Sequence, residues 1–202
     1  MRGWVAVVVV VIGIVVLCGV VAAATSNGRD HTGDTVRASK WADAVCGTVG
    51  AWEGDLHAIR DEYQRNNYAA RQHDGGSGDS VEGRVTLRET VDRAIRATED
   101  TLQEGLKRAG NPDVSNGEQA SATLRAWAQR TEHNLRVAKQ ALKHKPDSTS
   151  EAYSLLVTQG SALVRSILDG QAAFNQVTGL DPALADAFNG SKRCQELKEG
   201  QP

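Results

Sequence analysis

The sequence has few aromatic residues and almost no net charge. Aromatic side chains make up 4% of the 202 residues, and the formal net charge is −2. A nucleic-acid-binding domain usually carries a basic surface, and single strands are bound by stacking on aromatic rings. The composition therefore argues against nucleic acid as a partner.

The sequence also lacks the common catalytic motifs. It contains no G-x-S-x-G, H-E-x-x-H, S-x-x-K or Walker pattern. The glycine-rich stretch at 75–80 has neither the lysine nor the preceding strand of a phosphate-binding loop, so it indicates a turn. His57 and Asp61 lie four residues apart on a predicted helix, but two ligands do not make a metal site. We expect no catalytic residues, no cofactor and no metal.

One long apolar run is present near the start of the chain. Trp4 to Ala24 contains no charged residue and is long enough to span a bilayer. The apolar region of a cleaved signal peptide is shorter, roughly 7 to 15 residues. We predict a short cytoplasmic tail at 1–3 and a retained transmembrane anchor at 4–24. Small residues at 22–24 leave an alternative open, in which cleavage after Ala24 releases a secreted protein.

Three cysteines occur, one in the apolar run and two, Cys46 and Cys194, outside it. There is no C-x-x-C, and no histidine lies within four residues of either of these two, so the spacing matches no compact metal site. A pair outside the membrane indicates a disulfide, with two inert thiols as the alternative. Because few intracellular proteins keep disulfides, the pairing favours an external domain, although the basic residues flanking the span point weakly the other way.

The remainder of the chain has the patterning of helices. Polar, glycine-containing residues 25–40 indicate a flexible tether. A helical stripe with steps of three and four follows, comprising Trp41, Val45, Val49, Trp52, Leu56, Ile59 and Tyr63. A second stripe runs from Leu87 to Ala109 and ends at Gly110. No stretch alternates with a period of two, so we predict no strand.

Two more long helices and a short one complete the prediction. Asn116 can cap a third helix, whose stripe runs from Leu124 to Leu142. A capping box at 148–151 begins a fourth, which continues to Phe174. Asp181 and the following proline begin a short fifth helix that reaches Phe188. Residues 198–202 form a tail.

These elements predict an all-α fold. Four long helices with short connections favour an up-down-up-down bundle over 41–197, with a short C-terminal helix. In that topology the start of the first helix and the end of the fourth lie at the same end, so Cys46 and Cys194 can meet. A disulfide there closes a loop for which the chain-entropy model gives on the order of 5 kcal/mol.

The two tryptophans of the first stripe have two interpretations. Trp41 and Trp52 share a face with Val45 and Val49, which favours a place in the core. The alternative is an exposed aromatic patch that contacts a partner.

The pattern Trp41-x-Asp43-x-Val45-Cys46, the stretch at 109–114, and Cys194-x-x-Leu197 resemble small exported or membrane-anchored helical proteins of actinobacteria. This resemblance implies a location in the cell envelope and a pair of cysteines, and it supplies no activity.

Two classes of function remain. In the first, the bundle is a non-catalytic binding or interaction module on the outer face of the membrane, contacting an envelope protein or small ligand. In the second, it is an enzyme or enzyme accessory whose site is assembled only in the fold. We expect the first, because enzymes usually contain a recognisable constellation of polar groups.

Overall fold

A computed structural model describes residues 35–73, 81–142 and 169–199. Within these ranges no helix combines the length and the apolar composition needed to cross a membrane. The anchor predicted at 4–24 lies outside the described residues, as does the capping box at 148–151.

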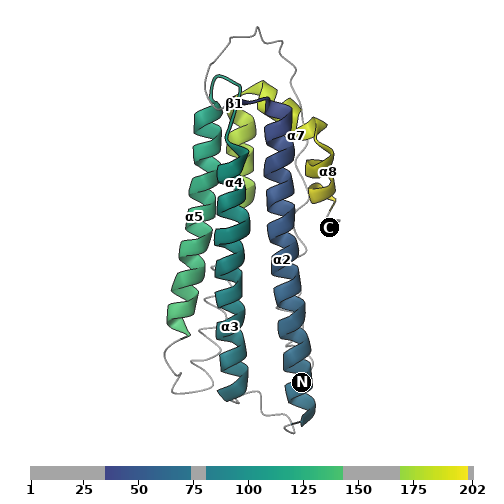
Figure 1. The fold of residues 1–202 in the computed structure, drawn as a ribbon, viewed down its shortest axis with the longest axis vertical. Helices are drawn as coiled ribbons and strands as arrows, with labels where there is room; N and C mark the ends of the chain where they lie inside the picture. Colours follow the sequence, from purple (N-terminus) through teal and green to yellow (C-terminus); the bar gives the residue numbers. More distant parts are fainter. Residues whose placement is uncertain (1–34, 74–80, 143–168, 200–202) are drawn as a thin grey trace.

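The described chain is a helical bundle, as predicted (Figure 1). Helix α2 (Ala38–His73) runs along the long axis, and α3 (Val81–Ala97) returns beside it. The same rod continues through the π-helix η2 (Thr98–Gln103) and α4 (Glu104–Ala109). Helix α5 (Gly117–Ala141) then runs in the direction of α2, and residues 169–180 are helical as well.

Two short helices complete the end at which α2 begins (Figure 1). Helix α7 (Pro182–Gly190) starts as predicted, with the Asp181 side chain accepting a hydrogen bond from the Ala183 amide at 2.9 Å. Helix α8 (Lys192–Lys198) was not predicted from the sequence. It has seven residues, which is too short for a visible stripe, and its cap is the Ser191 hydroxyl.

The prediction of no strand was wrong. β1 (Thr35–Val36) pairs in parallel with β2 (Asn111–Pro112), and the Asp113 amide extends the pairing to the Val36 carbonyl at 2.8 Å. Strands of two residues are too short to show alternation in a sequence. β1 and the first turn of α2 both lie within the stretch 25–40 that we had interpreted as a tether.

The loop that contains β2 is fixed by one carbonyl group. The second helical rod ends at Gly110 as predicted, where φ is 71°, a value that favours glycine. The Gly110 carbonyl accepts hydrogen bonds from the Trp41 indole at 3.0 Å and the Ser121 hydroxyl at 2.8 Å. These bonds join the starts of α2 and α5 to the end of α4.

The prediction that Asn116 caps α5 with its side chain was wrong. Asn116 occupies the capping position, but its side chain makes no capping bond. Its amide instead donates to the Leu180 carbonyl at 2.8 Å. A long-range partner thus replaces the local one, and the bond ties α5 to the residues just before α7.

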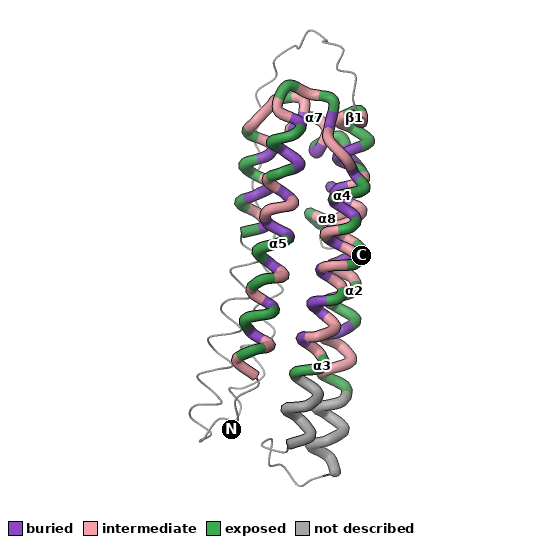
Figure 2. The backbone as a smooth tube through the Cα atoms, turned by 60° about the vertical axis from the view of Figure 1, so that its left-hand side comes forward, coloured by how far each residue is buried: buried purple, intermediate pink, exposed green. Residues whose placement is uncertain are grey.

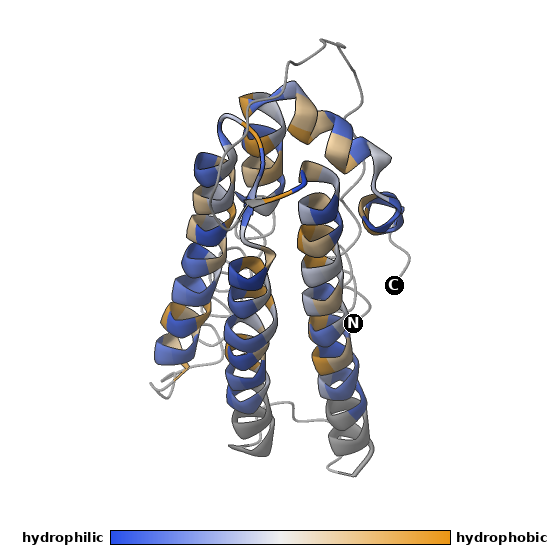
Figure 3. Ribbon diagram, turned by 45° about the horizontal axis from the view of Figure 1, so that its top comes forward, coloured by the Kyte–Doolittle hydropathy of each residue, from blue (hydrophilic) through white to orange (hydrophobic). Residues whose placement is uncertain are grey.

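Buried residues recur along the helices of the bundle (Figure 2). The apolar ones among them form two clusters. The larger lies towards the end that carries α7 and α8 and contains the buried tryptophans. The smaller joins α3 to α5 and consists of Val91, Ala94, Ile95 and Leu135. The visible outer faces of α3 and α5 are mainly hydrophilic (Figure 3).

Candidate interaction surface

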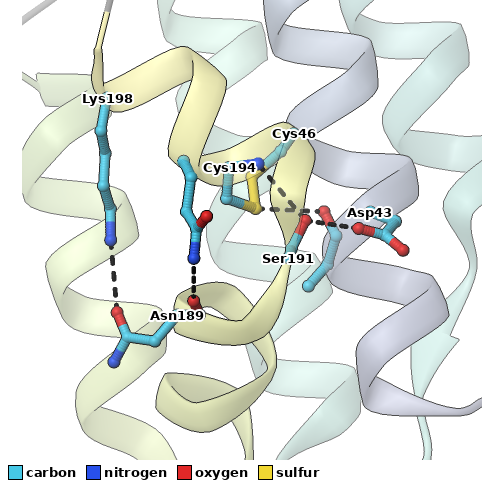
Figure 4. Close-up of a disulfide and its surroundings, with 8 residues drawn as sticks. Asp43, Cys46, Asn189, Ser191, Cys194 and Lys198 are labelled. Atoms are coloured by element: carbon cyan, nitrogen blue, oxygen red, sulfur yellow. Dashed lines mark hydrogen bonds between the residues drawn. A yellow bond between two sulfur atoms is a disulfide. The ribbon is translucent and has the colours of Figure 1, made fainter.

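The predicted disulfide between Cys46 and Cys194 is confirmed. It joins α2 to α8 with a Cα–Cα distance of 5.1 Å across 148 residues of sequence (Figure 4). The two cysteines are 2% and 3% exposed. A bond so well covered is structural in character, because reagents cannot reach either sulfur without local opening.

Polar groups around the disulfide hold α8 in place. The Ser191 hydroxyl accepts a hydrogen bond from the Cys194 amide at 3.3 Å and donates its own proton to the Asp43 carboxylate (Figure 4). The side chain of Arg193 packs directly over Gly47, so α8 lies close against α2 at this point. The helix is therefore joined to α2 by a covalent bond, a hydrogen bond and a close contact.

Five aromatic rings form a continuous chain through the larger cluster. Trp41 contacts Phe188 at 5.6 Å between ring centroids, and Phe188 contacts Phe174 at 5.5 Å. Phe174 contacts Trp127 at 6.1 Å, and Trp127 contacts Trp52 at 5.8 Å. All four contacts are edge-to-face, the geometry that the ring quadrupoles favour. Trp41 and Trp52 are 1% and 4% exposed, which places them in the core and not in a surface patch.

The aromatic chain ends at the start of the π-helix. The Trp52 indole donates to the Thr98 hydroxyl at 3.1 Å, and that hydroxyl donates to the Ala94 carbonyl at 2.9 Å. Thr98 is the first residue of η2 and is fully buried. Single π turns inside α-helices are rare and are often found at functional sites. The surface next to this turn is therefore the candidate functional surface.

A shallow open hollow of about 310 Å³ lies between α2 and α3 beside the π turn. Its lining, which we call the α2–α3 hollow, consists of Asp55, Ala58, Ile59, Arg93, Arg96 and Ala97. The apolar part of this lining, which we call the floor, consists of Ile59, which is 8% exposed, and the two alanines. Charged residues form the two walls, acidic on α2 and basic on α3.

The charged groups of the hollow differ in whether they already have a hydrogen-bond or ion-pair partner within the protein. Arg93 pairs with Glu62 at 2.7 Å, and this contact lowers the pKa of the Glu62 carboxyl and raises the pKa of Arg93. Asp55 accepts a hydrogen bond from the Thr101 hydroxyl at 2.8 Å through one oxygen. Arg96 is exposed and makes no hydrogen bond or ion pair with another described residue.

The side of η2 that faces α5 is closed by a polar network. Arg136 of α5 pairs with both Glu99 and Glu132, and Gln103 donates to Glu132 at 2.7 Å. The hydrogen bond from Arg136 lowers the pKa of the Glu132 carboxyl. These charges already satisfy one another, so this side offers less to a partner than the α2–α3 hollow does.

The residues considered for a metal site are not brought together. His57 is exposed on α2, and Asp61 forms an ion pair with Arg60 at 2.8 Å. In the described ranges, no group of three or more histidine, cysteine and acidic side chains could hold a metal ion.

Sequence reasoning missed the α2–α3 hollow. Asp55 and Arg96 look like ordinary solvated charges in the sequence, and nothing local relates them. Only the pairing of α2 with α3 places them on facing walls.

Comparison of the chain with protein-family models, with curated proteins and with solved structures finds no match. The resemblance to actinobacterial envelope proteins therefore stays a prediction.

Proposed function

We propose that this protein is a membrane-anchored binding module, in which the helical bundle lies on the outer face of the membrane and acts by contact with a partner. The anchor is the apolar run at 4–24, and the bundle begins only a short distance beyond it, at β1.

The disulfide is the observation that carries the proposal. A buried bond between Cys46 and Cys194 joins the first and last helices of the described bundle. Disulfides of this kind form and persist in oxidising compartments and are rare in the reducing cytosol. An external bundle follows if the chain is held by a single span at its N-terminus.

The character of the surface supports binding over catalysis. The interior is packed with aliphatic and aromatic side chains, and the α2–α3 hollow is open to solvent. Catalysis gains most from polar groups held in a water-excluded site, whereas an open hollow with an apolar floor and a charged rim has the composition of a protein interface.

Labelling of intact cells with a membrane-impermeant maleimide tests the proposed placement. Ser115 is exposed in the loop before α5, and Arg2 precedes the apolar run. We expect Ser115→Cys to be labelled in intact cells and Arg2→Cys to be labelled only after lysis. The wild-type chain measures the background from Cys18.

The reverse pattern, with Ser115→Cys protected until lysis, would contradict the external placement. Labelled protein recovered from the medium and not from the membrane would show that the chain is released, which is the secreted alternative.

A further inference from the structure

We propose that the α2–α3 hollow binds a second copy of this chain, so that the protein forms a two-fold symmetric dimer through this surface. The inference deepens the proposed function, because it names the surface and the partner of the binding module.

The arrangement of charge favours a second copy as the partner. Asp55 stands on the α2 wall and Arg96 on the α3 wall of the same hollow, and the two do not pair with each other. A two-fold interface uses the same surface on both copies, so every contact between two residues occurs twice. Asp55 of each copy can therefore meet Arg96 of the other copy. A surface with opposite charges on facing walls is thus complementary to itself.

The floor of the hollow suits close packing of helices. Ala58 and Ala97 present only methyl groups, and Ile59 adds an almost fully buried aliphatic side chain. An apolar centre with a charged rim is the general composition of protein interfaces. Ion pairs on the rim add specificity and define the register more than they add affinity.

The heights of the two charges along the bundle are compatible with copies that lie parallel. Asp55 is level with Thr101, to which it is hydrogen-bonded, and Arg96 lies five residues earlier on the same rod. That separation is about 7 Å along a helix, a distance that an extended arginine side chain covers. Parallel copies place both chain starts at one end, as two anchors in one membrane require.

Charge reversal with rescue tests the dimer. The full chain in detergent is examined by sedimentation velocity over a range of concentrations, as wild type, Asp55→Arg, Arg96→Asp and the double variant. Each single reversal replaces two symmetric attractions by repulsions, so we expect the dimer dissociation constant to rise by about tenfold or more. The double variant restores opposite charges across the interface and returns the constant to near the wild-type value.

A control variant and a spectroscopic check separate this result from other causes. Glu196→Arg changes the charge by the same amount on α8, away from the hollow, and leaves the dimer constant unchanged. Circular dichroism confirms that every variant is folded. A monomeric wild type would overturn the proposal, as would dimers that survive both single reversals or a double variant that is not rescued.

These outcomes are independent of the placement of the bundle. If the protein is a monomer and is labelled from outside the cell, the dimer proposal is wrong and the external placement stands. If it is a dimer and its Ser115→Cys variant is protected, the dimer proposal stands and the external placement is wrong.

Discussion

The two ends of the bundle are held together by different means. The end near α7 and α8 contains the aromatic chain, the disulfide and the paired strands β1 and β2. Farther from that end, the described residues of α3 and α5 form a cluster of four buried aliphatic side chains and ion pairs such as Asp92 with Lys139. Ion pairs at the protein surface contribute little, about 0 to 1 kcal/mol each. The first end is therefore expected to persist when the second opens.

Removal of the disulfide has the largest expected effect. Cys46→Ala together with Cys194→Ala releases a loop of 148 residues. The chain-entropy model sets the loss in unfolding free energy at up to about 5 kcal/mol. Urea unfolding followed by circular dichroism measures it, with Cys18→Ala as the matched control. A loss no larger than that of the control would mean that the disulfide does not stabilise the bundle.

Truncation of the central ring of the aromatic chain comes next. Trp127 contacts both Trp52 and Phe174 and is 2% exposed. Trp127→Ala leaves a large cavity and should lower the unfolding free energy by about 3 to 5 kcal/mol. The loss should appear as a single lower melting temperature for the entire described bundle. An unchanged melting temperature would contradict the role of the chain as the centre of the core.

A substitution in the smaller cluster should act locally. Leu135→Ala removes a side chain that is 3% exposed between α3 and α5, at an expected cost of about 2 to 3 kcal/mol. Hydrogen exchange should increase in α3 and the end of α5, while α7 and the start of α2 stay protected. Equal increases at both ends would show that the bundle opens as one unit and would contradict the contrast between them.

The smallest expected effect is that of a partly buried carboxylate on α2. Burial raises the pKa of the Glu53 carboxyl above its ordinary value of 4.5. The folded state then binds more protons than the unfolded state between the two pKa values, so stability falls as pH rises through that window. Glu53→Gln should therefore be more stable than wild type at neutral pH. Its advantage should shrink as the pH drops below both pKa values, as thermal unfolding across pH will show.

The length of each element determines whether it could be predicted from the sequence. The stripe that contains Trp41, Val45 and Trp52 is a local pattern with helical period, so the helix and its buried face could be predicted from it. The cysteine pair could be predicted because only two cysteines lie outside the apolar run. The short helix α8 and the strands β1 and β2 carry too few residues for a periodic signal.

Long-range hydrogen bonds were the other features beyond prediction. Asn116 is a residue type that commonly caps helices, but its side-chain amide donates a hydrogen bond to a carbonyl 64 residues away. Likewise, Asp55 and Arg96 acquire a relation only when α2 and α3 lie side by side. The roles of such residues depend on their neighbours in the folded structure. Their neighbours in the sequence do not reveal these roles.

The state of the cysteines in the native membrane tests the central claim, an external bundle closed by the Cys46–Cys194 disulfide. Membranes are treated with iodoacetamide under denaturing conditions, and the intact mass is measured before and after reduction and further alkylation. The account predicts one alkylated cysteine, Cys18, before reduction and all three after it, with the chain starting at residue 1 or 2. Three alkylated cysteines before reduction would contradict it.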